Sequence, residues 1–394
     1  MEQIITSILD SDLYKFTQQA AVIKKFPDVD VIYEFINRDK SVQFPEGFDV
    51  ELRKQVQGFS DLRFTEAEEL LFAKKCPYLD RTYFTYLRGF KFNPSHVGIV
   101  QNGGELIIKI CGPWHETILW EVPLMATISE LYFRMKSLKP TSRDDRRKNN
   151  TKKANFFNHN GHLLVDFGTR RRFSEEIHEE VICDLLDNNL HKKFVGTSNV
   201  KFAIKYNTRV IGTHAHEWFM VHAAKYGYKM ANRLALDNWV SVYRGDLGIA
   251  LSDTFTTDAF FYSFDKIHSK LFDGVRHDSG DPIAFGNKVI EHYGQLGIDP
   301  TTKTIVFSDN LNIESAEIIA KAFNGRIRIS FGIGTNLTND VGVKPLNMVI
   351  KITGARVFGK RYVPTIKLSD NPEKHIGPQE DIEICKRQLN QYFV

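Results

Sequence analysis

Short apolar runs recur along the second half of the chain, and stretches with helical periodicity separate most of them. The runs cover residues 163–167, 194–195, 209–211, 247–251, Val275 with its neighbours, 304–307 and 327–331. Strands that alternate with helices predict parallel strand-helix-strand units, since a parallel connection needs a crossover. Seven units in succession favour an α/β barrel over an open sheet.

Local signals predict several individual elements before and within this region. A helix is expected from Ser11 or Asp12 to residue 25, a strand over 29–36, and helices over 48–58 and 65–75. Thr65 and Glu68 have capping-box spacing. Residues 97–100 and 106–110 flank a Gly-Gly turn and predict a hairpin, and 113–135 reads as a loop followed by a buried helix. Further on, helices are expected over 174–189 and after the Asp281-Pro282 pair.

Composition bounds the class of protein. The chain has 394 residues, which predicts two domains, and its net charge of +4 is a weak excess that does not argue for nucleic acid. Its four cysteines form no metal-binding or redox spacing, which favours a reducing compartment. No signal peptide or apolar stretch of membrane-spanning length is present in the sequence. We therefore expect a cytosolic enzyme or binding protein.

The segment 139–161 differs from its surroundings. Few of its residues before Phe156 are apolar, and its basic residues include Arg143, Arg146, Arg147, Lys148, Lys152 and Lys153. The plain interpretation is a solvated, mobile loop or helix end. Two sharper alternatives are a lid over an anionic ligand and a nucleic-acid module whose binding would depend on salt.

A polar cluster follows each apolar run. The clusters cover residues 166–172, 196–199, 212–218, 252–254, 276–281, 308–310 and 332–336. Any one of them could be an ordinary turn, because turns use the same residue types. In an α/β barrel, however, the loops after the strands share one face and carry the working residues. The repetition predicts a site on that face, and Gly212-Thr213-His214-Ala215-His216-Glu217-Trp218 is its centre.

The residue types in these clusters suggest phosphate and ribose handling. Gly332, Gly334 and Thr335 offer backbone N–H groups and a hydroxyl for a phosphate. Two arginines, Arg170 and Arg276, are planar forks that can grip a carboxylate or a phosphate. Three aspartates, Asp253, Asp278 and Asp309, suit ribose hydroxyls or the water shell of Mg²⁺. Of the three consecutive arginines 170–172, one is expected to point inward and the others outward.

Taken together, the motifs of this chain resemble those of nicotinate phosphoribosyltransferase. The resemblance is carried, in order, by the runs CGPW, WEVPL, DFGTRRRF, VGTSN, GTHAHEW, LSDT, GVRHDSGDP, VFSDN, SFGIGT, VKPLNMVIK and KLSD. GTHAHEW and GVRHDSGDP are the most specific of these. The match spans nearly the whole chain, is weak over 139–161, and does not extend to residues 371–378, on which little was expected to depend.

The resemblance implies a fold and a reaction. The fold is that of type II phosphoribosyltransferases: an irregular seven-stranded α/β barrel, here 136–344, and an α/β domain built from 1–135 and 345–394. The reaction joins nicotinate to phosphoribosyl pyrophosphate, giving nicotinate mononucleotide and pyrophosphate, and is coupled to ATP hydrolysis. Mg²⁺ would travel with the pyrophosphate or nucleotide, without protein metal ligands. The active unit would be a homodimer.

The resemblance also assigns residues. His216 would be the histidine phosphorylated by ATP, whereas His214 occupies a position where the family does not need histidine. The resemblance places Thr213 and Arg276 on nicotinate, with Arg276 pairing with the nicotinate carboxylate. Phe167 would stack on one face of the pyridine ring and Tyr14 of a partner subunit on the other. The family motifs also assign phosphate contacts to Arg170, Gly332, Gly334 and Thr335, other substrate contacts to Ser198, Asp253 and Asp309, and a catalytic role to Asp278.

Competing functions remain open at the level of sequence. Nicotinamide phosphoribosyltransferase shares the fold and the histidine and is the first alternative. Quinolinate phosphoribosyltransferase would leave His216 unexplained. A non-catalytic barrel that senses a nucleotide would have no need of His216, Arg276 and Asp278 together.

Overall fold

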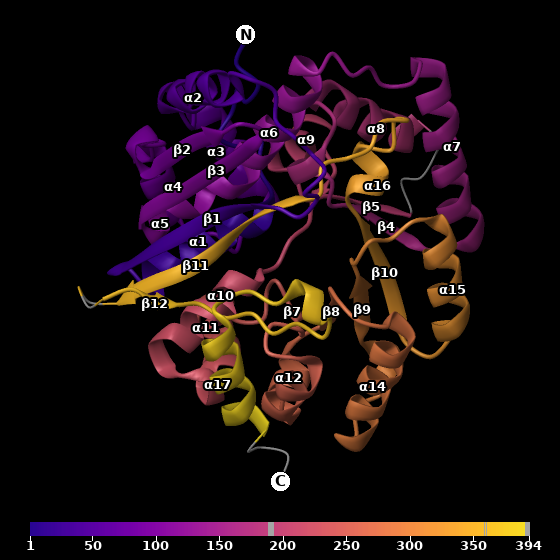
Figure 1. The fold of residues 1–394 in the computed structure, drawn as a ribbon. Helices are drawn as coiled ribbons and strands as arrows, with labels where there is room; N and C mark the ends of the chain where they lie inside the picture. Colours follow the sequence, from indigo (N-terminus) through magenta and orange to yellow (C-terminus); the bar gives the residue numbers. More distant parts are fainter. Residues whose placement is uncertain (188–192, 358, 360, 391–394) are drawn as a thin grey trace. The chain divides into compact units, whose positions relative to one another are not determined.

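The computed structural model describes residues 1–394 except 188–192, 358, 360 and 391–394. Its strands form two sheets. One has seven strands in the order β6-β5-β4-β10-β9-β8-β7, and the other has five in the order β12-β11-β1-β3-β2. Figure 1 labels individual strands of both sheets. The predicted α/β class with a seven-stranded parallel sheet is confirmed.

The strands and helices have the following bounds. The five-stranded sheet consists of β1 (Val29–Asn37), β2 (Val97–Asn102), β3 (Glu105–Pro113), β11 (Met348–Val357) and β12 (Val363–Pro364). The seven-stranded sheet consists of β4 (Leu163–Asp166), β5 (Phe194–Thr197), β6 (Arg209–Val210), β7 (Ile249–Leu251), β8 (Gly274–His277), β9 (Thr304–Phe307) and β10 (Arg328–Ile333). The helices of the first half are α1 (Leu13–Lys25), α2 (Phe48–Gly58), α3 (Glu66–Lys75), α4 (Arg81–Gly89), α5 (Trp114–Thr117), α6 (Glu121–Met135), α7 (Arg143–Asn160), α8 (Glu175–Asp187) and α9 (Val200–Lys205). Those of the second half are α10 (His216–Tyr226), α11 (Tyr228–Tyr243), α12 (Thr257–Ser263), α13 (Lys266–Leu271), α14 (Pro282–Gln295), α15 (Ile313–Phe323), α16 (Thr335–Thr338) and α17 (Gln379–Asn390). Among these described helices, none combines the length and apolarity needed to cross a membrane.

The chain divides into two compact units. Unit 1 comprises Met1–Ala20, Ile32–Gly212 and Ile333–Lys351, and unit 2 comprises Ala21–Val31, Thr213–Gly332 and Ile352–Val394. This division follows the density of contacts rather than the two sheets, so the predicted domain boundaries at 135/136 and 344/345 stay a prediction.

Aromatic side chains fill unit 1. Trp120 is fully buried and stacks on Phe59 with ring centroids 5.4 Å apart, while Phe92 packs against it at 4.6 Å. Large aromatic rings bury more apolar area than any other side chains, which makes this cluster a major source of stability in the unit.

Unit 2 has its own aromatic core around α10 and α11. Trp218 and Trp239 are buried with their ring centroids 5.6 Å apart, and the indole N–H of Trp218 donates to the carbonyl of Ala235 at 3.0 Å. These contacts fix the orientation of α10, whose first residue is His216.

The parallel register aligns the carboxyl ends of neighbouring strands. In unit 2, Leu251 of β7 pairs with Arg276 of β8, and His277 of β8 pairs with Phe307 of β9. In unit 1, Asp166 of β4 pairs with Thr197 of β5. Residues that follow these strands therefore emerge at a common edge within each unit, as the sequence pattern predicts.

Segment 139–161 is the clearest departure from expectation. Residues Arg143–Asn160 form an 18-residue helix that begins after Ser142, whose side chain accepts from the N–H of Asp145. The prediction of a mobile loop or helix end is wrong, because these residues form a regular helix and three of its basic side chains have acidic partners within unit 1. These are Asp184 for Arg143, Glu180 for Arg146 and Asp340 for Lys153.

Candidate functional site

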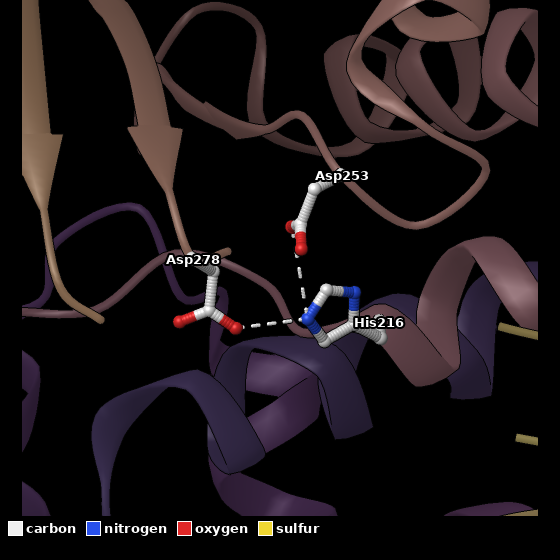
Figure 2. A group of neighbouring side chains, drawn as sticks. All are labelled: His216, Asp253 and Asp278. Carbon is white, nitrogen blue, oxygen red and sulfur yellow. Dashed lines mark hydrogen bonds and ion pairs between the residues drawn. The ribbon is translucent and has the colours of Figure 1, made fainter. Parts of the chain in front are cut away.

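His216 opens α10, directly after the loop that follows β6. Its neighbours come from two other strands and from the C-terminal part of the chain. Asp253 lies two residues after β7, and Asp278 follows the last residue of β8. Figure 2 shows both carboxylates directed at the same ring nitrogen of His216. The predicted strand-to-helix position of the histidine is confirmed.

Four polar groups surround the imidazole ring. Asp278 Oδ2 lies 2.9 Å from Nε2, and Lys367 Nζ lies 2.8 Å from the same nitrogen. Thr254 Oγ1 is 3.0 Å from Nδ1, and Asp253 Oδ1 is 3.8 Å from Nε2. Only 5% of His216 is exposed. The ring is held in one orientation, away from bulk water.

Burial and charge keep this ring neutral. Burial lowers the pKa of His216 to about 4, and the ammonium of Lys367 acts in the same direction, whereas the carboxylates of Asp253 and Asp278 oppose both. A histidine with so low a pKa carries one nitrogen lone pair at neutral pH. Such a nitrogen can act as a nucleophile or accept a proton.

The two aspartates remain ionised. Burial alone would raise the pKa of Asp278, but Arg276, His216 and Lys367 together bring it well below its usual range. For Asp253, burial is likewise outweighed by Lys367 and His216, so its pKa is lowered. Asp253 also accepts hydrogen bonds from the hydroxyls of Ser279 and Ser369. Two fixed negative charges thus face any positive charge that develops on the imidazole.

Arg276 lies beside this cluster on β8. One of its terminal nitrogens is 3.9 Å from Asp278 Oδ2, and its side chain is 16% exposed. Its Nε is buried and has no hydrogen-bond partner among the described residues. A buried donor without an acceptor is uncommon in native proteins, and a bound ligand is one group that can supply the missing acceptor.

His214, two residues earlier, has a structural role. Its Nε2 accepts the N–H of Leu251 at 3.2 Å, and its ring packs against Phe219 and Trp239. Burial lowers its pKa well below the ordinary value. Of the two histidines in the motif, His214 ties the loop to β7 and the core, and His216 faces the charged cluster.

The remaining predicted site residues of unit 2 are placed as follows. Asp309 follows β9 and accepts from Lys374 Nζ, whose ammonium also donates to the carbonyl of Asp278 at 2.9 Å. Thr213 is the first residue of unit 2, and Gly332 lies within β10. Within unit 2 the structure therefore brings together His216, Asp253, Arg276 and Asp278, and Lys374 links Asp309 to the backbone of that group.

A second group of predicted residues lies in unit 1. The guanidinium carbon of Arg170 is 5.9 Å from the centroid of the Tyr14 ring, and Arg170 pairs with Glu121 at 3.4 Å. Ser198 donates its hydroxyl to Asp12 at 2.8 Å. Of the three consecutive arginines it is Arg172 that points inward, where it is fully buried in a bidentate pair with Asp10.

The close packing around Gly334 has a structural cause. A Cβ on Gly334 would lie 3.1 Å from the carbonyl oxygen of Phe167, whose own N–H donates to Ile333. Thr335 is the first residue of the short helix α16. The glycine is required by this approach whether or not a phosphate binds there.

Sequence reasoning missed the residues that the C-terminal segment supplies. Lys367 and Ser369 belong to the KLSD run, whose sequence alone does not indicate a role in the site. Lys374 lies within 371–378, and the expectation that little depends on that segment is wrong, since Lys374 contacts Asp309 and Asp278. Thr254 and Ser279 stood inside recognised motifs but received no assignment.

His216, Asp253 and Asp278 form a candidate metal site. One ligand atom from each of His216, Asp253 and Asp278 lies within 4.8 Å of the others, a set that could hold a cation. The ammonium of Lys367 is already 2.8 Å from His216 Nε2 and 3.8 Å from Asp253 Oδ2. A divalent ion would repel this charge at close range. The ammonium of Lys367 therefore suits this cluster better than a bound metal ion does.

Comparison with known proteins finds one family over most of the chain. A family model described as the nicotinate phosphoribosyltransferase (NAPRTase) family matches residues 162–394, and one for the N-terminal domain of that family matches residues 9–129. A nicotinate phosphoribosyltransferase of Chromohalobacter salexigens is 51% identical over 386 residues, covering 98% of each chain. One of Desulforapulum autotrophicum is 50% identical over 387 residues, covering 98% of this chain and 99% of the other.

A solved structure is similar over the same extent. The crystal structure of nicotinate phosphoribosyltransferase from Porphyromonas gingivalis matches with a TM-score of 0.95 and 41% identity, covering 98% of this chain and 100% of that one.

Proposed function

Because the chain belongs to the nicotinate phosphoribosyltransferase family, we propose that it transfers phosphoribose from phosphoribosyl pyrophosphate to nicotinate. The products are nicotinate mononucleotide and pyrophosphate, and the reaction is the first step of NAD salvage from nicotinate. It is coupled to hydrolysis of ATP to ADP and phosphate, so the enzyme is classed as a ligase. Mg²⁺ enters with the phosphate substrates. We place the enzyme in the cytoplasm, where its free cysteines stay reduced.

The observation that carries the ATP-coupled step is the environment of His216. A buried, neutral imidazole with two ionised carboxylates beside it is arranged to attack a phosphorus atom. In the proposed step a ring nitrogen of His216 forms a bond to the γ-phosphorus of ATP, and the bond from that phosphorus to the oxygen of ADP breaks. Asp278 and Asp253 stabilise the positive charge that the ring acquires. Water later cleaves the N–P bond and releases phosphate.

The substrate contacts are proposed from the same motifs. Arg276 pairs with the nicotinate carboxylate, which supplies an acceptor for its buried Nε, and Thr213 contacts the same substrate. Substitution at ribose C1 passes through a cationic state, so the protein contributes mainly positioning and charge stabilisation. The other proposed substrate contacts are Phe167, Arg170, Ser198, Asp253, Asp309, Gly332, Gly334 and Thr335.

The phosphohistidine is tested by substituting His216. We expect His216→Ala to abolish labelling of the protein from γ-³²P-ATP and to remove the stimulation of nicotinate mononucleotide synthesis by ATP. Some ATP-independent transfer survives, because the phosphoribosyl and nicotinate contacts remain. His214→Ala, checked for folding by circular dichroism, is the matched comparison and retains the label. Label that persists in His216→Ala but disappears in His214→Ala would refute the assignment.

We further propose that the active unit is a homodimer with shared sites, in which Tyr14 of one subunit stacks on nicotinate bound by the other. Mixing Tyr14→Ala chains with His216→Ala chains should then restore ATP-coupled turnover, since one hybrid site regains both residues. His216→Ala mixed with Asp278→Asn is the control, because both changes fall within unit 2 and no hybrid site is repaired. Failure of the first mixture despite demonstrated subunit exchange would mean that each site comes from one chain.

A further inference from the structure

Residues 365–376 of unit 2 run past the ends of β7 and β8 and supply a charge to the histidine site. We propose that Lys367 is a positioning residue for His216: its ammonium contacts Nε2 and opposes a second proton on the imidazole, so that the ring keeps a nitrogen lone pair. The inference deepens the proposed phosphorylation of His216 and rests on it for its catalytic meaning. The charge arrangement itself is a property of the resting protein.

The position of Lys367 is fixed on both sides of its backbone. Its N–H and carbonyl exchange hydrogen bonds with Ile376 at 3.0 and 2.9 Å, and the N–H of the next residue, Leu368, donates to the carbonyl of Thr254 at 2.9 Å. Thr254 is the residue whose hydroxyl contacts His216 Nδ1. The backbone that carries the lysine is thus bonded to the same loop that orients the ring.

Neighbouring side chains strengthen this attachment. The hydroxyl of Ser369 donates to that of Ser279 at 2.8 Å, and Ser279 donates to Asp253. Asp370 accepts from the N–H and the hydroxyl of Thr257 at the start of α12. The Lys367 side chain is only 5% exposed. An ammonium held in this way is a built part of the cluster, unlike a surface lysine that samples many rotamers.

Lys367 and Asp278 contact the same nitrogen of His216 in opposite hydrogen-bond roles: the ammonium can only donate, and the ionised carboxylate can only accept. Nε2 of His216 lies 2.8 Å from the ammonium and 2.9 Å from Asp278 Oδ2. If Nε2 carries the proton it donates to Asp278, and if it is bare it accepts from Lys367. A doubly protonated ring would direct an N–H toward the ammonium at this distance. Lys367 therefore penalises the imidazolium, which has no lone pair, and leaves both neutral forms available.

The charged groups that face His216 can be weighed against each other. Asp253 and Asp278 favour the imidazolium, while Lys367 opposes it, and Arg276 offsets part of the charge of Asp278. His214 packs in the core behind this cluster, within electrostatic range of Arg276 and His216, and burial lowers its pKa well below the ordinary value. Without Lys367, two carboxylates would remain beside the ring with no cation in direct contact with Nε2. An opposite charge within hydrogen-bond distance typically raises the pKa of a histidine by about one unit or more.

The decisive variants replace the charge while keeping the length of the side chain. Lys367→Met removes the ammonium, and Lys367→Arg keeps a cation. Lys367→Gln is a second neutral variant in case the methionine protein does not fold. Lys386→Met is the matched control: it removes a lysine charge from α17, where that side chain is 41% exposed and pairs with Glu383.

The first measurement is made without ATP. Histidine labelled with ¹⁵N is titrated by NMR, and the His216 signal is assigned as the one lost in His216→Asn. We expect the pKa of His216 to rise by about one unit or more in Lys367→Met, and to stay near the wild-type value in Lys367→Arg and Lys386→Met. An unchanged pKa in both neutral variants would overturn the proposal, whatever the enzyme does with ATP.

The second measurement is the initial rate of ³²P incorporation from γ-labelled ATP against pH. In Lys367→Met the acid limb should move upward by the same shift, so that a rise of the His216 pKa from about 4 to about 5 roughly doubles the ratio of the rates at pH 8 and pH 5, and a rise to about 6 increases that ratio about tenfold. Lys367→Arg should restore the wild-type profile. An equal loss of rate at every pH would mean that Lys367 has only a structural role. Absence of label in the wild-type protein would refute the proposed function while leaving the NMR result to decide the charge arrangement.

Discussion

At the scale of single residues, the site is defined by which buried polar atoms have partners. The carboxylate of Asp278 has several partners: His216, the hydroxyl of Ser308 at 3.1 Å and, more distantly, Arg276. The Nε of Arg276 has no partner among the described residues. Leaving a buried donor unsatisfied costs about 1–3 kcal/mol, more for a charged group, and an incoming carboxylate removes that cost. The same atom that lowers the stability of the free protein can therefore favour an acidic substrate.

This asymmetry predicts the behaviour of Arg276→Gln. A hydrogen bond to a charged group contributes about 1.5–3 kcal/mol, so its loss should raise the KM for nicotinate about tenfold or more. Nicotinamide lacks the carboxylate, so its KM should change much less and the preference for the acid over the amide should narrow. Steady-state kinetics with both substrates measures the ratio. An unchanged ratio would show that Arg276 does not read the carboxylate, and an initial preference for the amide would favour the nicotinamide alternative.

The structure brings predicted site residues together where the sequence signal is local, while their roles stay predictions. His216, Asp253, Arg276 and Asp278 each lie in or directly after an element of the βα pattern, and parallel strands gather such positions at one edge. Lys367 is 151 positions from His216 in the sequence. Its contact depends on the path of a segment with only a two-residue strand, and no periodicity or spacing reveals that path.

At the scale of elements, the accurate predictions were those with a cap or a turn signal. The capping box of Thr65 and Glu68 forms at the start of α3, and the side chain of Asp281 accepts from Ala284 N–H at the start of α14. The Gly-Gly turn joins β2 to β3 in antiparallel register. In each case a few neighbouring residues satisfy the backbone groups that an element leaves open, so the sequence is sufficient.

Elements stabilised by distant partners were harder to predict. Helix α7 has little apolar periodicity, and its charged face is neutralised by acidic residues of α8 and by Asp340. Helices α10 and α11 follow each other directly and are separated by Gly227 at φ 83°. That φ is open to glycine at little cost, so the break occurs there. The pairing of β11 from the C-terminal part with the N-terminal sheet also has no local signal.

At the scale of the whole molecule, burial of histidines couples stability to pH. Burial lowers the pKa of His216 to about 4 and that of His222 to about 3, and it lowers that of His214 well below the ordinary value. The pKa is lowered, chiefly by burial, for five further histidines: His96, His162, His277, His292 and His375. Neutral histidine suits these positions because each ring sits where a second proton would be poorly solvated.

His222 shows the geometry behind this effect. Its Nδ1 lies 2.6 Å from the carbonyl of Trp218, and its Nε2 lies 3.0 Å from the side-chain nitrogen of Asn238. One nitrogen therefore donates and the other accepts, which satisfies the neutral ring completely. A second proton would replace the acceptor with another donor facing the amide of Asn238.

The sign of the pH dependence follows from linkage. In the unfolded chain these histidines take up a proton near pH 6.5, whereas in the folded protein His216 and His222 stay neutral to about pH 4 and 3. Between those limits the unfolded state binds more protons, so the free energy of unfolding falls as the pH falls. Each such histidine contributes at most about 1.4 kcal/mol per pH unit. Three carboxyls with raised pKa offset part of this loss: Asp12, Glu130 and Asp370.

We therefore expect the free energy of unfolding, measured with urea at a fixed protein concentration, to be nearly level above about pH 7.5 and to fall steeply from about pH 6.5 toward pH 5. In His222→Gln the change in the free energy of unfolding per pH unit should be smaller over that window by up to about 1.4 kcal/mol, which corresponds to one proton, even if the variant is less stable at pH 8. His159→Gln is the control, since the His159 side chain is exposed in the folded protein and its removal should leave the slope in place. A wild-type stability that is flat from pH 8 to pH 5, or equal slopes in His222→Gln and wild type, would show that the buried histidines do not govern the acid side of the stability curve.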